Sequence, residues 1–208
     1  MRLKKNSNIG LYDSRFEKES CGLGFVAQIN KEPSHQNIKD ALTILCNMDH
    51  RGARGSEPNS GDGAGILTGI PHTFFAGIAK ECFGVYLEEG GYAVGNIFLP
   101  NEEKEIEFCK KSFEETCSEN ELEIIGWRDL PIDIKKADIG PSALKAMPKI
   151  EQVFVKDNSS CFNQEDFERG LYLARKKVSN HLRFNSELDE ADLFYICSLS
   201  SKTIVYKG

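Results

Sequence analysis

The chain has 208 residues, of which 40% are hydrophobic and 10% aromatic, enough to fill the core of one soluble domain. Its formal net charge of −6 argues against nucleic acid as the principal partner, because the phosphate backbone is bound by concentrated lysine and arginine. No apolar run approaches the roughly 18–20 residues that cross a bilayer, and the N-terminus lacks the apolar core of a signal peptide. We therefore expect a cytoplasmic protein without a membrane segment.

The first third of the chain is predicted to contain a leader, a strand, a helix and a loop. Residues 1–20 are polar and charged with little periodicity, and we interpret them as a leader. Apolar side chains alternate over residues 22–29, which predicts a strand. Within 37–46 they recur at intervals of three and four, which predicts a helix that begins after Pro33-Ser34. The glycine-rich residues 50–65 are predicted to form a loop.

The rest of the chain is predicted to alternate between strands and helices. A short strand resumes at residues 66–67, and a helix begins near Pro71. The other predicted helices cover 101–119 and 163–184, the second with Asn163 as its N-cap, and the other predicted strands cover 123–127, 152–155, 193–199 and 202–206. We expect the last two strands to pair as a hairpin over Ser200-Ser201. This alternation favours layered α and β structure over an all-β barrel.

The seven cysteines are scattered without a C-x-x-C or C-x-C spacing, which predicts neither a disulfide framework nor a zinc site. Six of them are expected to pack as small hydrophobic side chains in a reducing compartment. Cys21 is different, because glycines follow it at the head of a predicted strand. If the Ser20-Cys21 bond is cut, the residue offers a thiol together with its own α-amine, which titrates at ~7.7–8.0 and can serve as the base. Taken alone, Cys21 also fits a buried cysteine that starts a strand.

Other local motifs carry weaker signals. Residues 22–27 fit the G-x-G-x-x-A dinucleotide pattern, but a charged segment precedes them where that fingerprint requires a strand. Gly61-Asp62-Gly63-Ala64-Gly65 lacks the Lys-Ser/Thr of a phosphate-binding loop. In His50-Arg51-Gly52, the arginine on a tight loop can place its guanidinium against a carboxylate or a developing oxyanion, or form an ordinary loop salt bridge.

In combination, these short motifs are far more specific than any one of them. Their order along the chain resembles the start of the glutamate synthase large subunit, in its class II glutamine amidotransferase domain. The matching stretches are Cys21-Gly22-Leu23-Gly24-Phe25, residues 47–53, 57–66 and 70–75, Ile139-Gly140-Pro141, residues 147–155 and the closing residues 198–208. The resemblance therefore covers nearly the whole chain.

The resemblance implies an N-terminal-nucleophile (Ntn) hydrolase fold, an α+β four-layer αββα sandwich in which two antiparallel sheets lie between helical layers. Residues 1–20 would be a propeptide, and residues 21–208 the N-terminal part of the amidotransferase domain. In the family, the cysteine thiolate attacks the side-chain amide of L-glutamine, releases ammonia and leaves a thioester that water hydrolyses. Cys21 would be this nucleophile, and Arg51 would lie beside it and shape the pocket. Gly52 and the glycines from 61 to 65 would let the backbone approach the nucleophile.

The resemblance also implies cofactors and partners outside this segment, in which we expect no cofactor or metal. In the family, the ammonia passes through a tunnel to downstream synthase domains of the same polypeptide. There, FMN and an iron–sulfur cluster support its addition to 2-oxoglutarate in glutamate biosynthesis. The electron donor would be a nicotinamide-dependent subunit or ferredoxin.

One departure from the family pattern is that no Asn-Gly pair occurs in the 208 residues. The family's glutamine-binding and oxyanion-hole stretches are expected to follow an ending like this one. The sequence therefore predicts a C-terminally incomplete fold that is inactive by itself. One alternative is a short amidotransferase-like scaffold with a binding or regulatory role. A different class II amidotransferase, making amino sugars or purines, fits less well because residues 57–66 and the long insert before Cys197 look specific to glutamate synthase.

Overall fold

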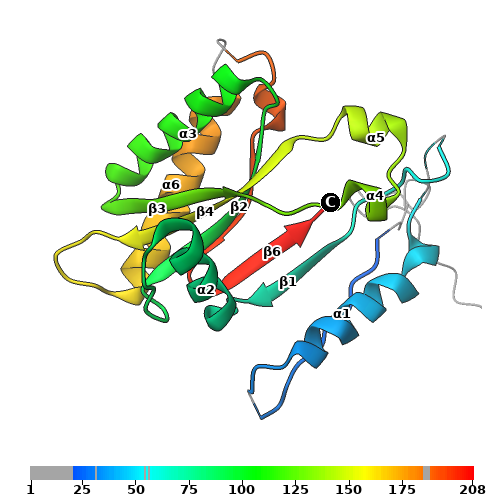
Figure 1. The fold of residues 1–208 in the computed structure, drawn as a ribbon, viewed down its shortest axis with the longest axis horizontal. Coiled ribbons are helices and arrows are strands. Elements are labelled where there is room, and N and C mark those ends of the chain that lie inside the picture. Colours follow the sequence, from blue (N-terminus) through cyan, green and yellow to red (C-terminus); the bar gives the residue numbers. More distant parts are fainter. Residues whose placement is uncertain (1–20, 31, 54, 56, 185–187) are drawn as a thin grey trace, which may run out of the picture. The chain divides into compact units, whose positions relative to one another are not determined.

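The computed structural model describes residues 21–208 except 31, 54, 56 and 185–187. The leader predicted over residues 1–20 lies outside the described residues. The chain divides into two compact units between Asp62 and Gly63 (Figure 1). Among the described residues, no helix combines the length and apolar character that crossing a membrane requires.

The first unit is built around the helix α1 (His35–Asn47), which the short 3-10 helix η2 (Asp49–Arg51) follows. The side chain of Ser34 caps α1, because its Oγ accepts a hydrogen bond from the backbone N–H of Gln36 at 3.1 Å. The helix predicted over residues 37–46, with its start signal at Pro33-Ser34, is therefore confirmed.

The strand predicted over residues 22–29 is wrong, because residues 21–28 form no strand in the structure. All of these side chains are exposed, including Leu23 at 95% and Phe25 at 89%. Alternating apolar residues favour an extended strand, but a strand also needs a neighbour whose backbone pairs with its own N–H and C=O groups. The described part of the first unit contains no strand that does so.

The second unit contains two antiparallel sheets. The larger has the order β3-β4-β2-β5 and consists of β2 (Tyr92–Leu99), β3 (Leu122–Asp129), β4 (Lys149–Asp157) and β5 (Tyr195–Ser200). The smaller pairs β1 (Gly65–Gly69) with β6 (Thr203–Lys207). The mixed helix-and-sheet class with antiparallel sheets is therefore confirmed, as are the strands predicted near residues 66–67, 123–127 and 152–155.

Two long helices, α3 (Glu103–Ser118) and α6 (Gln164–Arg183), lie side by side and cover one face of the larger sheet (Figure 1). Their apolar stripes meet inward-facing strand residues in one buried cluster, in which Phe113, Leu171 and Ile97 are fully inaccessible. The Oδ1 atom of Asn163 caps α6 by accepting from two backbone N–H groups of its first turn. Both helices and this cap agree with the sequence prediction.

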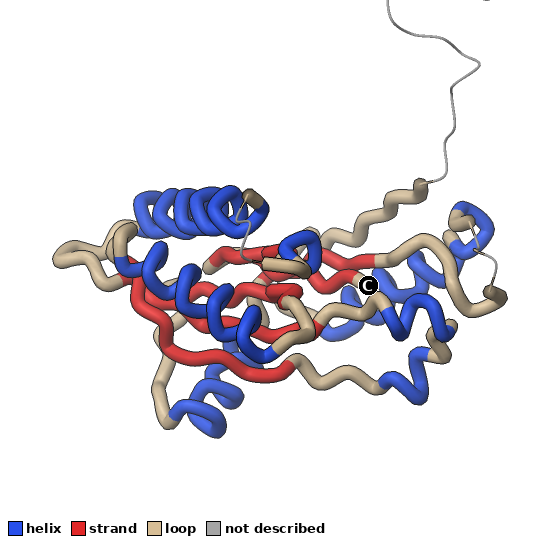
Figure 2. Tube along the Cα trace, turned by 90° about the horizontal axis from the view of Figure 1, so that it is seen from above, coloured by secondary structure: helices blue, strands red, loops and turns tan. Residues whose placement is uncertain are grey.

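The opposite face of the larger sheet packs against the β1–β6 pair and the helix α2 (His72–Phe83). Phe75 of α2, Phe154 of β4 and Ile204 of β6 are buried together there. The view from above in Figure 2 shows the strands with helices on both sides. Three short helices, α4 (Ile134–Ala137), α5 (Pro141–Lys145) and η3 (Ala191–Leu193), complete the described elements.

The hairpin predicted between the last two strands is wrong, although both strands exist. β5 pairs with β2 in the larger sheet, whereas β6 pairs with β1 in the smaller one. Glu168 of α6 holds the connection between β5 and β6, because its carboxylate accepts from the backbone N–H and the hydroxyl of Ser201 and from the hydroxyl of Ser200. The chain therefore passes from one sheet to the other at Ser200-Ser201, instead of folding back within one sheet.

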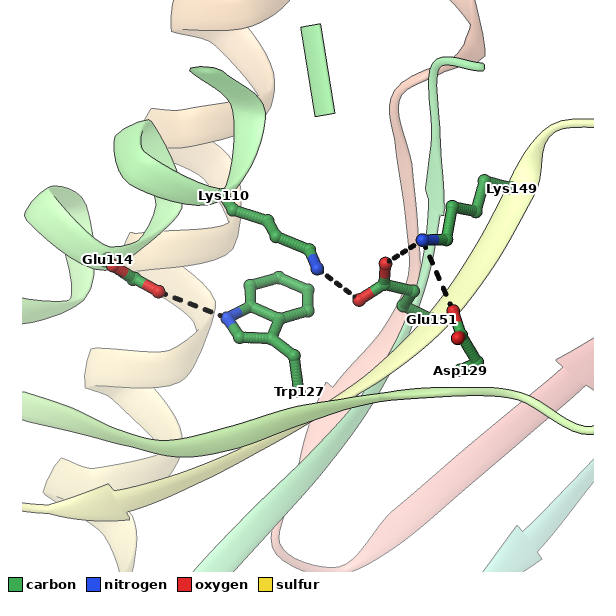
Figure 3. A network of polar contacts seen from close by, with 6 residues as sticks. All are labelled: Lys110, Glu114, Trp127, Asp129, Lys149 and Glu151. Carbon is green, nitrogen blue, oxygen red and sulfur yellow. Dashed lines mark hydrogen bonds and ion pairs between the residues drawn. The ribbon is translucent and has the colours of Figure 1, made fainter. Parts of the chain in front are cut away.

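A charged network lies at the edge of the helix-covered core (Figure 3). Glu151 of β4 is 2% exposed and forms ion pairs with Lys110 at 2.5 Å and Lys149 at 2.9 Å. The ammonium of Lys110 also lies 5.1 Å from the ring centroid of Trp127. The hydrogen bond to Glu151 raises the pKa of Lys149. Two partly exposed cations thus compensate the buried carboxylate.

Candidate functional site

Cys21 lies at the start of the exposed segment of the first unit, and α1 packs along one side of that segment. A Cβ atom added at Gly22 would lie 2.7 Å from Sδ of Met48, and one added at Gly24 would lie 2.3 Å from Cγ2 of Ile44. Both distances are shorter than real Cβ contacts. The two glycines after Cys21 are therefore required for the close approach of the segment to α1, and the thiol is left exposed.

Arg51 is the predicted site residue that the structure brings to Cys21. It ends η2, and its Nη2 donates a hydrogen bond to the backbone carbonyl oxygen of Cys21 at 3.2 Å. The neighbouring His50 is directed elsewhere, since its Nδ1 lies 3.0 Å from the carbonyl oxygen of Asn47. The guanidinium thus contacts the main chain of Cys21 across an interval of 30 residues.

Gly52 shows no close approach that would require a glycine. Its backbone is extended, with φ −85° and ψ 151°, and an added Cβ would meet the carbonyl oxygen of Asp49 at an ordinary 3.6 Å. Within the described residues, the structure therefore brings Arg51 to Cys21 but gives Gly52 no comparable contact.

Asp62 is a residue that sequence reasoning missed. Its Oδ2 accepts from the backbone N–H of Ala53 at 2.9 Å, and its own N–H donates to the carbonyl oxygen of Ala53 at 3.0 Å. These two bonds join Asp62 to Ala53, which follows Arg51 and Gly52 directly in the chain. The signal in the sequence is an aspartate among glycines, a residue type that commonly bonds to nearby backbone in loops.

The glycines after Asp62 serve a different contact from the one expected. An added Cβ at Gly63 would lie 2.1 Å from the carbonyl oxygen of Gly208, and one at Gly65 would lie 3.0 Å from that of Tyr206. Both positions therefore admit the backbone at the end of β6 within the second unit. The expected role of this stretch, to let the backbone approach the nucleophile, is not what these two contacts show.

The cysteines fall into two classes. Cys109, Cys117 and Cys197 are buried, and burial raises the pKa of the first two thiols to about 12. The other four cysteines, Cys21, Cys46, Cys82 and Cys161, are exposed. The expectation that all six cysteines other than Cys21 are packed is therefore wrong for three of them, which lie on α1, on α2 and in the loop before α6.

The geometry around Cys21 leaves its thiol available for nucleophilic attack. The hydrogen bond from Arg51 holds the backbone carbonyl of Cys21, and the thiol of Cys21 remains exposed to a substrate. Among the residues that the structure describes, no three His, Cys, Asp or Glu side chains are grouped as ligands for a metal ion. A thiol needs a base for attack, and the α-amine of Cys21 would supply one after cleavage of the Ser20-Cys21 bond.

Comparison with known proteins finds a family that matches nearly the whole chain. The family described as class-II glutamine amidotransferases matches residues 21–208, so the match begins at Cys21. The chain is 39% identical over 200 residues to the glutamate synthase [NADPH] large chain of Bacillus subtilis, covering 96% of this chain and 12% of that protein. It is 40% identical over 203 residues to the glutamate synthase [NADH] of Schizosaccharomyces pombe, with 95% and 9% covered.

A third relative is the chloroplastic ferredoxin-dependent glutamate synthase of Oryza sativa, 40% identical over 192 residues, with 92% of this chain and 12% of that protein covered. The chain thus spans about a tenth of the length of these relatives.

Proposed function

We propose a function that starts from the family: the chain belongs to the class-II glutamine amidotransferases. The chain is then the glutaminase part of a glutamate synthase, and it hydrolyses L-glutamine to glutamate and ammonia. The observation that carries this proposal is the family match that starts at Cys21, together with the hydrogen bond from Arg51 to the carbonyl of that residue. The relatives, which are glutamate synthases, favour this function over a non-catalytic scaffold.

Cys21 is the nucleophile in this proposal. Its thiolate attacks the carboxamide carbon of glutamine, the C–N bond breaks, and ammonia leaves with a proton that the α-amine of Cys21 relays. Water then attacks the γ-glutamyl thioester, which releases glutamate and restores the thiol. Removal of residues 1–20 is required, because an amide nitrogen at Cys21 cannot accept the proton.

Arg51 is a positioning residue in this reaction, because the atom that it bonds is the carbonyl oxygen of the nucleophile residue. A guanidinium presents several donors in a fixed geometry, so one bond to Cys21 leaves others to face a substrate carboxylate. Gly52 lies between Arg51 and Ala53, the residue that Asp62 binds, and in this proposal it supports the substrate pocket.

In this proposal, the ammonia is added to 2-oxoglutarate in other parts of the parent enzyme. FMN and an iron–sulfur cluster would supply the redox chemistry there, with a nicotinamide cofactor or ferredoxin as the source of electrons. The reaction steps assigned to this chain do not involve them. We also propose that the fold is a four-layer Ntn sandwich. The two antiparallel sheets of the second unit would be its central layers.

A glutaminase assay of the full-length protein tests the proposal. Cys21→Ala is expected to lower kcat for glutamine hydrolysis at least ~10³-fold, because the covalent route is lost. Cys46→Ala is the matched control, since it removes another exposed thiol of the same unit and should retain the activity. Hydrolysis that survives Cys21→Ala would overturn the proposed function.

A further inference from the structure

The segment after Cys21 meets two side chains at the end of α1. Ile44 lies in the helix, and Met48 is its C-cap. An added Cβ at Gly24 would lie 2.3 Å from Cγ2 of Ile44, and one at Gly22 would lie 2.7 Å from Sδ of Met48. The glycines are matched to these side chains in reverse order, so the segment and α1 run in opposite directions.

The intervals along the two partners agree where the segment runs along α1 (Figure 1). An extended chain advances about 3.3 Å per residue, and an α-helix advances about 1.5 Å per residue. Two residues of the segment and four residues of the helix therefore both cover about 6–7 Å, so both contacts form at once. A shift by one residue would place a large side chain such as Leu23 where the structure admits a glycine.

Arg51 adds a third contact to the same series. Its Nη2 donates to the carbonyl oxygen of Cys21 at 3.2 Å, and its own backbone N–H donates to the carbonyl oxygen of Met48 at 2.8 Å. Met48 in turn is bound to α1, because its N–H donates to the carbonyl oxygen of Ile44 at 3.1 Å. The contacts with the end of α1 therefore continue up to Cys21 itself.

Core packing does not explain the two side chains. No residue of α1, which is described throughout, is buried, and Ile44 and Met48 are only partly covered. An added Cβ at Gly24 would lie an ordinary 3.6 Å from Cβ of Ile44, and one at Gly22 would lie 3.5 Å from Cβ of Met48. Only the atoms beyond each Cβ therefore require a glycine opposite them.

We propose that Ile44 and Met48 are positioning residues that set the register of the segment after Cys21, and that this register presents the thiol for attack on glutamine. The register concerns only contacts within the first unit. The link to catalysis rests on the proposed function, so the two parts are tested by different measurements.

A designed cross-link in the full-length protein tests the register. The 3.6 Å between the two Cβ positions suits a disulfide, which spans about 3.5–4.5 Å. Gly24→Cys with Ile44→Cys, in a Cys46→Ala background, should form this bond in most molecules under mild oxidation, as peptide mass mapping detects. Phe25→Cys with Ile44→Cys is the matched control, because it shifts the partner by one residue and should form little of the bond. Similar yields from the two pairs, or none from the first, would overturn the register.

An exchange of side-chain size tests the link to the reaction. Gly24→Ala and Ile44→Ala are each expected to lower kcat for glutamine hydrolysis about tenfold, because a small displacement of the nucleophile is costly. The double variant should recover most of the activity, since the new methyl group then meets only the Cβ at position 44. Leu42→Ala is the control, because it truncates an exposed side chain of α1 and should neither lower kcat nor rescue Gly24→Ala. The thermal unfolding midpoint should stay the same in all of them, which separates positioning from a loss of fold.

Met48 is tested by a conservative replacement. Met48→Ala should lower kcat in the same way, and Met48→Leu, which nearly keeps the side-chain volume, should restore it. Unchanged kcat in the single variants, or a double variant no better than they are, would contradict the positioning role. If the wild-type protein shows no Cys21-dependent hydrolysis, the proposed function fails, and the cross-link yields still decide the register.

Discussion

The segment after Cys21 and the strand β2 place similar side chains in opposite surroundings. Leu23 and Phe25 are almost fully exposed, whereas Val94 and Ile97 of β2 are fully buried. β2 has β4 along one edge and β5 along the other, so its backbone groups are paired on both sides. Residues 21–28 have α1 on one side and form no strand. The comparison teaches that neighbouring strands, more than apolar content, decide whether such a sequence becomes a strand.

The two units also differ in what they contribute: the second supplies most of the buried core, and the first carries the candidate nucleophile. The buried clusters of the second unit supply the apolar burial that stabilises a fold. The candidate nucleophile lies in the first unit, where the side chains around it are open to a substrate. Substitutions in the two regions should therefore affect different measurements.

The largest expected effect is on folding, from truncation of a core aromatic residue. Phe154 is fully buried, with its ring centroid 5.6 Å from that of Phe75 and 5.4 Å from that of Phe83. Phe154→Ala should lower the free energy of unfolding by about 3–5 kcal/mol, measured by urea denaturation. Phe25→Ala removes the same side chain from an exposed position and should change it by less than about 0.5 kcal/mol. Similar losses for the two variants would break the comparison.

A smaller effect is expected from a methyl group at two glycines of the second unit. Gly63→Ala places a Cβ 2.1 Å from the carbonyl of Gly208, and we expect a loss of about 1–3 kcal/mol from the displaced pairing of β1 with β6. Gly77→Ala is the control, because nothing lies within 4 Å of its added Cβ on α2. That variant should stabilise by about 0.5–1 kcal/mol through its better helix propensity. Equal responses in thermal unfolding would contradict the assigned contact.

A third effect appears only at alkaline pH and concerns the pH dependence of stability. Burial raises the pKa of Cys117 to about 12 in the folded state, so above the ordinary thiol pKa the unfolded chain releases a proton that the folded chain retains. The free energy of unfolding should then fall with rising pH, and Cys117 contributes about 1.4 kcal/mol per pH unit between roughly pH 9 and 11.

Cys117→Ala should make that fall shallower in urea titrations at several pH values. Val178→Ala truncates another fully buried residue without removing an ionisable group, so it should shift the curve and keep its slope. Identical slopes in wild type and Cys117→Ala would refute the assigned cause.

Local patterns in the sequence predict the helices well and the strand pairing poorly. The stripe and the Asn163 cap of α6 are encoded within about 20 adjacent residues, so its bounds follow from the sequence. β2 was missed because nearly all of its side chains are buried, which removes the alternation by which a half-exposed strand is recognised. The pairing of β6 with β1 was missed because Thr203 and Gly69, which face each other, are far apart in the chain.

In the candidate site, too, the sequence predicts what a local motif encodes and misses what tertiary contacts decide. The His50-Arg51-Gly52 motif drew attention to Arg51, and the structure places its guanidinium at the carbonyl of Cys21. Ile44 and Met48, which pack against the glycines after Cys21, look in the sequence like ordinary residues of a helix stripe and its end. Their role depends on which segment crosses the helix, and that is set by tertiary contacts.

The most direct test of the central claim is peptide mass mapping of the full-length protein after reaction with a glutamine analogue that carries an electrophilic diazoketone. The account predicts one label per chain, on the thiol of Cys21 at the N-terminus of its peptide, with excess glutamine slowing the labelling. Labelling spread over Cys46, Cys82 and Cys161 without protection by glutamine would contradict it, as would an active protein in which residues 1–20 still precede an unlabelled Cys21.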